Sequence, residues 1–130
     1  MSIKVHLAGG KKVNAIVGDF EIKTDQSVHA GGEGSAPDPF TLFLASIGTC
    51  VGVYVQSFCD QRKISSDGIR INMEYQYDTI ARLIGKILID IIVPPDFPGK
   101  YDNAVINTAG LCTVKRHLKE SIPVEITVSR

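Results

Sequence analysis

The sequence predicts an α+β protein in which antiparallel sheets wrap two central helices. Three observations lead to this class: six short runs in which apolar and polar residues alternate, an uncharged run at residues 39–59, and a second helical pattern at 99–119. Their order is βββ-α-ββ-α-β, without repeats or linkers. The 130 residues, 44% hydrophobic and 22% charged, suffice for one globular domain over 1–130 but not for two independent cores.

The N-terminal strands form an expected antiparallel meander. Three runs alternate apolar and polar side chains, and a glycine-containing turn separates each run from the next. The runs are residues 3–7, 13–17 and 20–24, and the turns lie at 9–10 and 18–19. This sheet therefore has one apolar face that needs to be covered.

A loop rich in Gly, Ser and Pro follows at residues 26–38 and ends in Asp38-Pro39, a typical N-cap and first helical residue. We expect the first helix to run from about 39 to 62. Its apolar face is predicted to carry Phe43, Ile47, Cys50, Tyr54 and Phe58. A stripe of small residues, Ala45, Gly48 and Gly52, permits close backbone approach.

The uncharged run is long enough to span a bilayer. It contains several hydroxyl and amide side chains and lacks an aromatic and basic belt, so we favour a buried helix in a soluble protein and expect no membrane partner. Three strands cover such a helix poorly, which favours a homodimer with a shared helical centre, although a monomer with helices on one sheet face also fits. The formal net charge of zero permits association and gives no support to nucleic-acid binding.

The second half of the chain returns to strands after the Asp67-Gly68 turn. Strands are expected at 69–77 and 83–93, and the proline-rich residues after them end the second strand. A helix at 99–119 and a last strand at 124–128 complete the predicted order.

Three cysteines are too few for a disulfide scaffold, and none has the spacing of a zinc site. We therefore expect no metal and no cofactor. The first residues show no signal-peptide pattern, so we expect a cytoplasmic protein with reduced thiols, in which a disulfide would be transient and catalytic.

The sequence around each cysteine suggests what its thiol can do. Cys50 lies in mid-helix among apolar residues, where an inert buried thiol is the simpler reading. Cys112 has Lys115 and Arg116 one turn ahead; these cations either favour a thiolate or only suit the helix C-terminus. Cys59 lies about 180° around the helix from Cys50, so the two cannot pair, and we expect Cys59 to be dispensable.

The glycine-rich loop contributes two further candidates. His29 could act as a base or donor, or be an ordinary surface histidine. Glu33 stands in the Gly31–Gly34 segment, which lacks the lysine and basic context of a phosphate loop and reads as a flexible approach loop.

Two runs, GGEGSAPDPFTLFLASIGTC (31–50) and AVINTAGLCTVKRHL (104–118), resemble the OsmC/Ohr family. Members have a glycine-rich loop, a Pro-x-Pro helix start, a cysteine about ten residues into that helix and a second cysteine in the second central helix. The stretch RLIGKILIDIIVPPDFPGKYDNAV (82–105) is also similar. The resemblance covers nearly the whole chain and implies an intertwined homodimer with sites at the interface.

The resemblance further implies thiol-dependent, peroxiredoxin-like reduction of organic hydroperoxides in an oxidative stress response, without metal or haem. By carry-over, Cys50 is peroxidatic, Cys112 is resolving, and an external dithiol restores both. Characterised members activate the first cysteine with an N-terminal Arg and a Glu at the helix start. Here no Arg precedes Arg62, and Phe40 occupies the Glu position, which places the sequence with the broader OsmC-like branch.

The activator of Cys50 is therefore open. Supporting candidates are His29, Glu33 and Arg116, and the candidates from the N-terminal strands and turn are Lys4, Lys11 and Lys12. Two alternatives to a peroxidase also stay open: a non-catalytic dimeric module that binds an apolar small molecule between its helices, and a structural stress protein without a ligand.

Overall fold

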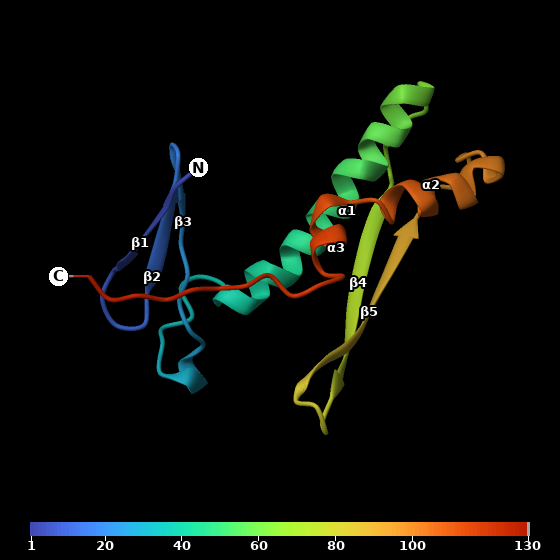
Figure 1. Cartoon of the computed structure of the whole chain (residues 1–130). Helices are drawn as coiled ribbons and strands as arrows, with labels where there is room; N and C mark the ends of the chain where they lie inside the picture. Colours follow the sequence, from blue (N-terminus) through green and yellow to red (C-terminus); the bar gives the residue numbers. More distant parts are fainter. Residues whose placement is uncertain (130) are drawn as a thin grey trace. The chain divides into compact units, whose positions relative to one another are not determined.

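The computed structural model describes residues 1–129, and the chain divides into two compact units, Met1–Ala45 and Ser46–Arg130. The boundary lies within the long helix α1 (Pro39–Arg62). Each unit contains one antiparallel sheet. Along the chain, α1 follows the first sheet, and further short helices follow the second (Figure 1). The α+β class is confirmed. One domain over 1–130 stays a prediction.

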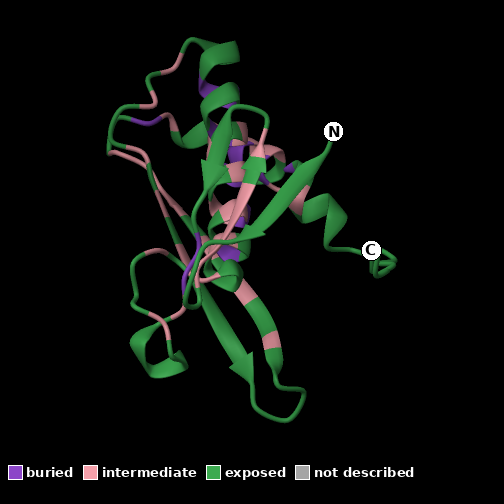
Figure 2. Cartoon of the chain, turned by 90° about the vertical axis from the view of Figure 1, so that its left-hand side faces the viewer, coloured by how far each residue is buried: buried purple, intermediate pink, exposed green. Residues whose placement is uncertain are grey.

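The first unit holds a three-stranded meander of β1 (Ile3–Leu7), β2 (Val13–Val17) and β3 (Phe20–Ile22). Gly9 and Gly10 adopt φ values of 94° and 57°, which a turn of this kind requires and other residues rarely adopt. Every residue of β1 and β3 is exposed (Figure 2). The central strand β2 is half-buried at four of its five residues, so the alternation expected for this sheet leaves only β2 partly covered within the first unit.

Helix α1 begins where the sequence predicts, because Asp38 caps it. The Asp38 carboxylate accepts hydrogen bonds from the backbone N–H of Phe40 (3.0 Å) and Thr41 (3.1 Å) and from the Thr41 hydroxyl (2.7 Å). These bonds, the Thr41 hydroxyl first, hold the pKa of Asp38 below its usual value.

The buried face of α1 is rotated from the predicted one. Its fully or almost fully buried residues are Leu44, Ile47, Val51, Val55, Phe58 and Cys59. Phe43, predicted to share this face, is 42% exposed and stacks on Phe40 with ring centroids 5.6 Å apart. Apolar residues occur all around α1, so the sequence pattern alone did not define the direction of its buried face.

Two glycines of the small-residue stripe pack against β4 (Arg70–Asp78). A Cβ atom at Gly48 would lie 3.9 Å from Met73 Sδ, and one at Gly52 would lie 3.6 Å from Ile71 Cδ1. The stripe thus brings a strand of the same chain close to the helix.

By length and composition α1 could cross a membrane, but core helices of soluble proteins meet the same criterion. The absence of a membrane partner stays a prediction.

The second unit pairs β4 with β5 (Leu83–Ile92) and packs them near α1 and the following helices. The helix expected at 99–119 is instead three short ones: η2 (Gly99–Tyr101), α2 (Asp102–Ala109) and α3 (Thr113–His117). The core is formed by Val51, Val55, Phe58, Cys59, Phe97, Val105, Ala109 and Cys112.

The predicted last strand at 124–128 is not formed in the described chain. Residues 118–129 carry no helix or strand, and the side chains of Val124, Ile126 and Val128 are 78–89% exposed. A strand exists only when its backbone groups find a partner strand, and this segment has none within residues 1–129.

Candidate functional site

Cys50 and Cys112, 62 positions apart in the sequence, interact through their thiols in the second unit. Cys50 lies on α1, one residue before the core residue Val51, and Cys112 follows the end of α2. Cys112 is fully buried, whereas Cys50 is half-buried. The structure therefore brings together two thiols of unequal accessibility.

A break in the helical chain positions Cys112. The expected continuous helix ends at Ala109, and the next residues turn through hydrogen bonds from Leu111 N–H to the Thr108 carbonyl (3.0 Å) and from Cys112 N–H to the Ala109 carbonyl (3.2 Å). Cys112 adopts an extended conformation (φ −55°, ψ 143°) and is the N-cap of α3. The placement of Cys112 within one continuous helix over 99–119 is therefore wrong.

Burial is the main influence on the Cys112 thiol and raises its pKa. The backbone N–H of Lys115, which donates to Cys112 Sγ at 3.4 Å, lowers it. The adjacent Cys50 thiol raises it, and the Lys115 charge lowers it again. The pKa of Cys112 is raised overall, which disfavours its thiolate at neutral pH.

A side-chain hydrogen bond connects the elements that carry the two cysteines. Tyr54 lies one helical turn after Cys50, and its hydroxyl is 3.2 Å from the Thr113 hydroxyl, next to Cys112. This bond joins α1 to the start of α3. The sequence analysis assigned Tyr54 only to an apolar face and missed this polar contact.

Of the two cations suggested for the thiol pair, Lys115 is the one in position. Its ammonium donates to the Gly110 carbonyl at 3.4 Å, over the turn that leads to Cys112. Arg116 is exposed, and within residues 1–129 its side chain makes no hydrogen bond or ion pair with either thiol. The role expected for Arg116 stays a prediction.

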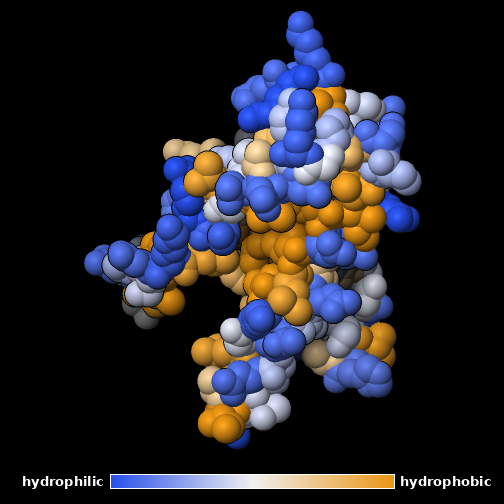
Figure 3. Space-filling model, turned by 90° about the vertical axis from the view of Figure 1, so that its right-hand side faces the viewer, coloured by the Kyte–Doolittle hydropathy of each residue, from blue (hydrophilic) through white to orange (hydrophobic). Residues whose placement is uncertain are grey.

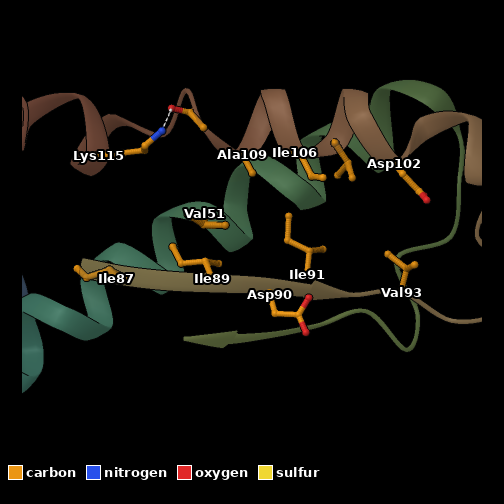
Figure 4. A pocket seen from close by; sticks show the side chains of 12 residues that line it. Val51, Ile87, Ile89, Asp90, Ile91, Val93, Asp102, Ile106, Ala109 and Lys115 are labelled. Atoms are coloured by element: carbon orange, nitrogen blue, oxygen red, sulfur yellow. Dashed lines mark hydrogen bonds between the residues drawn. The ribbon is translucent and has the colours of Figure 1, made fainter. Parts of the chain in front are cut away.

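A cavity of about 430 Å³ lies between β5 and α2, and its lining includes Val51, the residue after Cys50 (Figure 4). Its walls are mostly aliphatic, and three charged residues line it as well. Figure 3 shows apolar side chains gathered around a hollow on this face. The lining includes Val51, Ile87, Ile89, Ile91, Val93, Val105 and Ile106, together with Asp90, Asp102 and Lys115.

The other two supporting candidates, His29 and Glu33, belong to the first unit. His29 is exposed on the short helix η1 (Val28–Ala30). Glu33 forms an ion pair with Lys12 at 2.7 Å, and its side chain is 71% exposed. The roles expected for these two residues stay predictions.

Asp25 organises the glycine-rich loop and was missed by the sequence analysis. Its buried carboxylate accepts hydrogen bonds from the backbone N–H groups of Gln26 (2.7 Å), Glu33 (3.3 Å) and Ser35 (3.0 Å), and from the Ser35 hydroxyl (2.7 Å). The Ser35 hydroxyl bond is the largest influence, and together these bonds lower the pKa of Asp25 to about 2. The segment expected to be a flexible approach loop is therefore an ordered one.

Cys59 is fully buried in the core of the second unit, and burial raises the pKa of its thiol. Within residues 1–129, no group of three or more His, Cys, Asp or Glu side chains is placed to hold a metal ion.

The chain is thus an α+β protein in which a half-buried cysteine on α1 interacts with a fully buried cysteine at the start of α3. Residues 32–127 match the family model described as OsmC-like protein. The chain therefore belongs to the OsmC family. No curated protein sequence matches the chain significantly.

Several solved structures share the fold. A putative osmotic stress induced and detoxification response protein from Psychrobacter arcticus is 24% identical, with a TM-score of 0.76 over 89% of this chain and 86% of that one. An organic hydroperoxide resistance protein OsmC from Legionella pneumophila is 20% identical, with a TM-score of 0.60 over 91% and 88%. The organic hydroperoxide resistance protein OhrB of Bacillus subtilis is 19% identical, with a TM-score of 0.57 over 92% and 91%.

Proposed function

We propose that this protein reduces organic hydroperoxides through the thiol pair, with Cys50 as the peroxidatic cysteine and Cys112 as the resolving one. The observation that carries the proposal is the contact between the two thiols combined with their unequal burial. A peroxide can reach the half-buried Cys50, whereas the buried Cys112 is shielded from it. Structures named for organic hydroperoxide resistance share this fold and support the same chemistry.

The proposed reaction has two steps before reduction. The Cys50 thiolate attacks the distal oxygen of the hydroperoxide, the O–O bond breaks, and the alkoxide leaves as the alcohol after taking a proton. Cys50 is then a sulfenic acid. The Cys112 thiolate attacks its sulfur, the S–O bond breaks, and the hydroxide takes a proton and leaves as water. An external dithiol reduces the resulting disulfide by exchange, and no metal or cofactor takes part.

Mass mapping after oxidation tests this assignment. One equivalent of cumene hydroperoxide should produce a Cys50–Cys112 disulfide, and a dithiol should reverse it. Cys50→Ser should abolish peroxide consumption, whereas Cys112→Ser should consume one equivalent and leave Cys50 as a sulfenic or over-oxidised acid. Oxidation of Cys112 while Cys50 remains a thiol would overturn the roles. Unreactive thiols in all variants would overturn the activity.

The functional form proposed here is a homodimer in the cytoplasm. The C-terminal segment of the second unit leaves large apolar side chains exposed, and exposed apolar surface of this kind is typical of a protein interface. The exposed alternation of Val124, Ile126 and Val128 is one apolar surface that a second copy would cover.

Light scattering on matched variants tests the dimer. The unsubstituted protein should scatter as twice its chain mass at micromolar concentration. Ile126→Asp should shift it toward the monomer, because it places a charge on the apolar side of the segment. Thr127→Asp, on the opposite side of the same alternation, should leave the dimer intact. A monomer in all three samples would contradict the proposal.

The cavity supports a second candidate function, the binding of an apolar small molecule without catalysis. Its volume of about 430 Å³ and its aliphatic lining are within the usual range of ligand sites. An apolar fluorescent probe should then bind the unsubstituted protein and a Cys50→Ala/Cys112→Ala variant equally. Ile106→Trp, at the exposed rim, should weaken binding. No binding by the unsubstituted protein would exclude this candidate.

A further inference from the structure

We propose that Lys115 is a positioning residue for disulfide formation, in which its ammonium stabilises the Cys112 thiolate that attacks oxidised Cys50. The inference rests on the proposed function and adds a residue to its second step. It concerns a feature of this sequence: no Arg precedes Arg62, and Lys115 is a cation held next to one of the two thiols.

The geometry places Lys115 at the Cys112 turn by two contacts. Its backbone N–H donates to Cys112 Sγ at 3.4 Å, which fixes the sulfur against the first turn of α3. Its side chain folds back, and the ammonium donates to the Gly110 carbonyl at 3.4 Å (Figure 4). The charge is therefore held over the residues that directly precede Cys112.

Gly110 makes this fold-back possible. A Cβ atom at this position would lie 3.4 Å from Lys115 Nζ and 3.3 Å from the Asn107 carbonyl oxygen. Any larger side chain at this turn would compete with the ammonium for space. Lys115 is also one of the residues that line the cavity.

The other ionisable groups around Cys112 are few in the described chain. Cys50 interacts with it from α1, and Tyr54 lies one turn further along that helix. Asp90 of β5 and Asp102 of α2 line the cavity, where Asp102 lies at the opposite end from Lys115 and the Asp90 side chain points away from it (Figure 4). Lys115 is the cation among the groups that act on the Cys112 thiol.

In the proposed step the Cys112 thiolate donates its electron pair to the sulfenic sulfur of Cys50. Because burial disfavours the thiolate, loss of the Lys115 charge should reduce the fraction of Cys112 that can attack. The first step, in which peroxide oxidises Cys50, involves a different sulfur and should change less.

The test compares Lys115→Met with Lys119→Met, which removes an equal charge from an exposed position outside the helix. An NMR titration of cysteine labelled at Cβ reports the Cys112 thiolate without any peroxide. Rapid mixing with cumene hydroperoxide then reports sulfenic acid and disulfide formation separately. We expect Lys115→Met to slow disulfide formation at pH 8 a few-fold and to displace its pH profile upward. Lys115→Arg should restore most of the rate.

Three results would overturn the inference: an unchanged Cys112 titration in Lys115→Met, an equal effect of Lys119→Met, or a normal rate of disulfide formation despite a shifted titration. Failure of the proposed function is distinguishable, because in that case the unsubstituted protein would form no sulfenic acid at Cys50. The titration would still decide whether Lys115 stabilises the Cys112 thiolate.

Discussion

Gly32→Ala tests whether the glycine-rich loop has the ordered structure described above. An alanine Cβ at this position would lie 2.1 Å from the Gln26 carbonyl oxygen and 2.8 Å from Asp25 Oδ1. The Gln26 oxygen is a backbone atom that cannot rotate aside, so the loop itself has to move. Such a movement would disturb the hydrogen bonds that Asp25 accepts from Glu33 and Ser35.

The expected cost combines two effects. Overpacking of a close-packed site costs about 1–3 kcal/mol. Complete loss of one hydrogen bond to a charged group costs about 1.5–3 kcal/mol, and a weakened bond costs less. Since the loop can relax in part, we expect the free energy of unfolding to fall by about 3 kcal/mol. Urea denaturation at fixed protein concentration should show this as a lower midpoint with an unchanged slope.

Two matched glycines separate crowding from backbone strain. Gly34 has a φ of +65° and open space around its Cβ position, so Gly34→Ala should cost about 1 kcal/mol through strain alone. Gly99 also has open space and no positive φ, so Gly99→Ala should stay within about 0.5 kcal/mol of the unsubstituted protein. A Gly32→Ala variant as stable as Gly99→Ala would refute the reasoning.

Three further predictions follow from single contacts. The pKa of Asp25 is about 2 in the folded protein against an ordinary 3.8. The ionised carboxylate should therefore contribute fully to the free energy of unfolding above pH 4, and this contribution should be lost as the pH falls to about 2. In Asp25→Asn, the free energy of unfolding measured in urea should depend less on pH across that range. Cys59→Ala should retain peroxide consumption and lose about 1 kcal/mol in its free energy of unfolding. Cys59→Ser should lose more, because it buries a hydroxyl group. A variant that folds but consumes no peroxide would contradict this prediction. Tyr54→Phe should lose about 1 kcal/mol and slow disulfide formation a few-fold in rapid mixing, and an unchanged rate would separate the Tyr54–Thr113 bond from the reaction.

The elements that could be predicted from the sequence are those with local causes. Alternation and turn glycines predicted the meander, and Asp38-Pro39 predicted the start of α1, because strand faces and helix caps depend on neighbouring residues. The break before Cys112 has no comparable local signal. Residues 104–118 are apolar at helical spacing on both sides of Gly110, and one glycine can be tolerated within a helix.

Other features depend on contacts that are distant in sequence. The uncharged α1 has apolar residues on all sides, so its orientation is defined by tertiary packing, which includes β4 against Gly48 and Gly52. Asp25 looks like a polar strand residue until four hydrogen-bond donors from the following loop surround its carboxylate. The 124–128 segment has the alternation of a strand, but a strand also needs a partner. The resemblance singled out both cysteines, and the fold brings their thiols into contact.

The contact between the thiols also orders the two proposed steps. In the reduced protein Cys50 raises the pKa of Cys112, by hydrogen bonding and by charge, which disfavours the Cys112 thiolate. Oxidation turns Cys50 into a sulfenic acid, so the Cys50 thiol that exerts these two effects is no longer present. Cys112 then ionises more easily at the moment when its thiolate has a target.

This ordering predicts that the Cys112 thiolate becomes more stable when Cys50 cannot ionise. In Cys50→Ala, the Cys112 signal of Cβ-labelled cysteine should titrate at lower pH than in the reduced unsubstituted protein, because the effects of Cys50 that raise its pKa are gone while Lys115 remains. Cys59→Ala serves as the control, since Cys59 is not among the groups that shift the Cys112 pKa. If Cys112 titrates at the same or a higher pH in Cys50→Ala, the thiols do not restrain one another, and the order of the steps has to come from peroxide access alone.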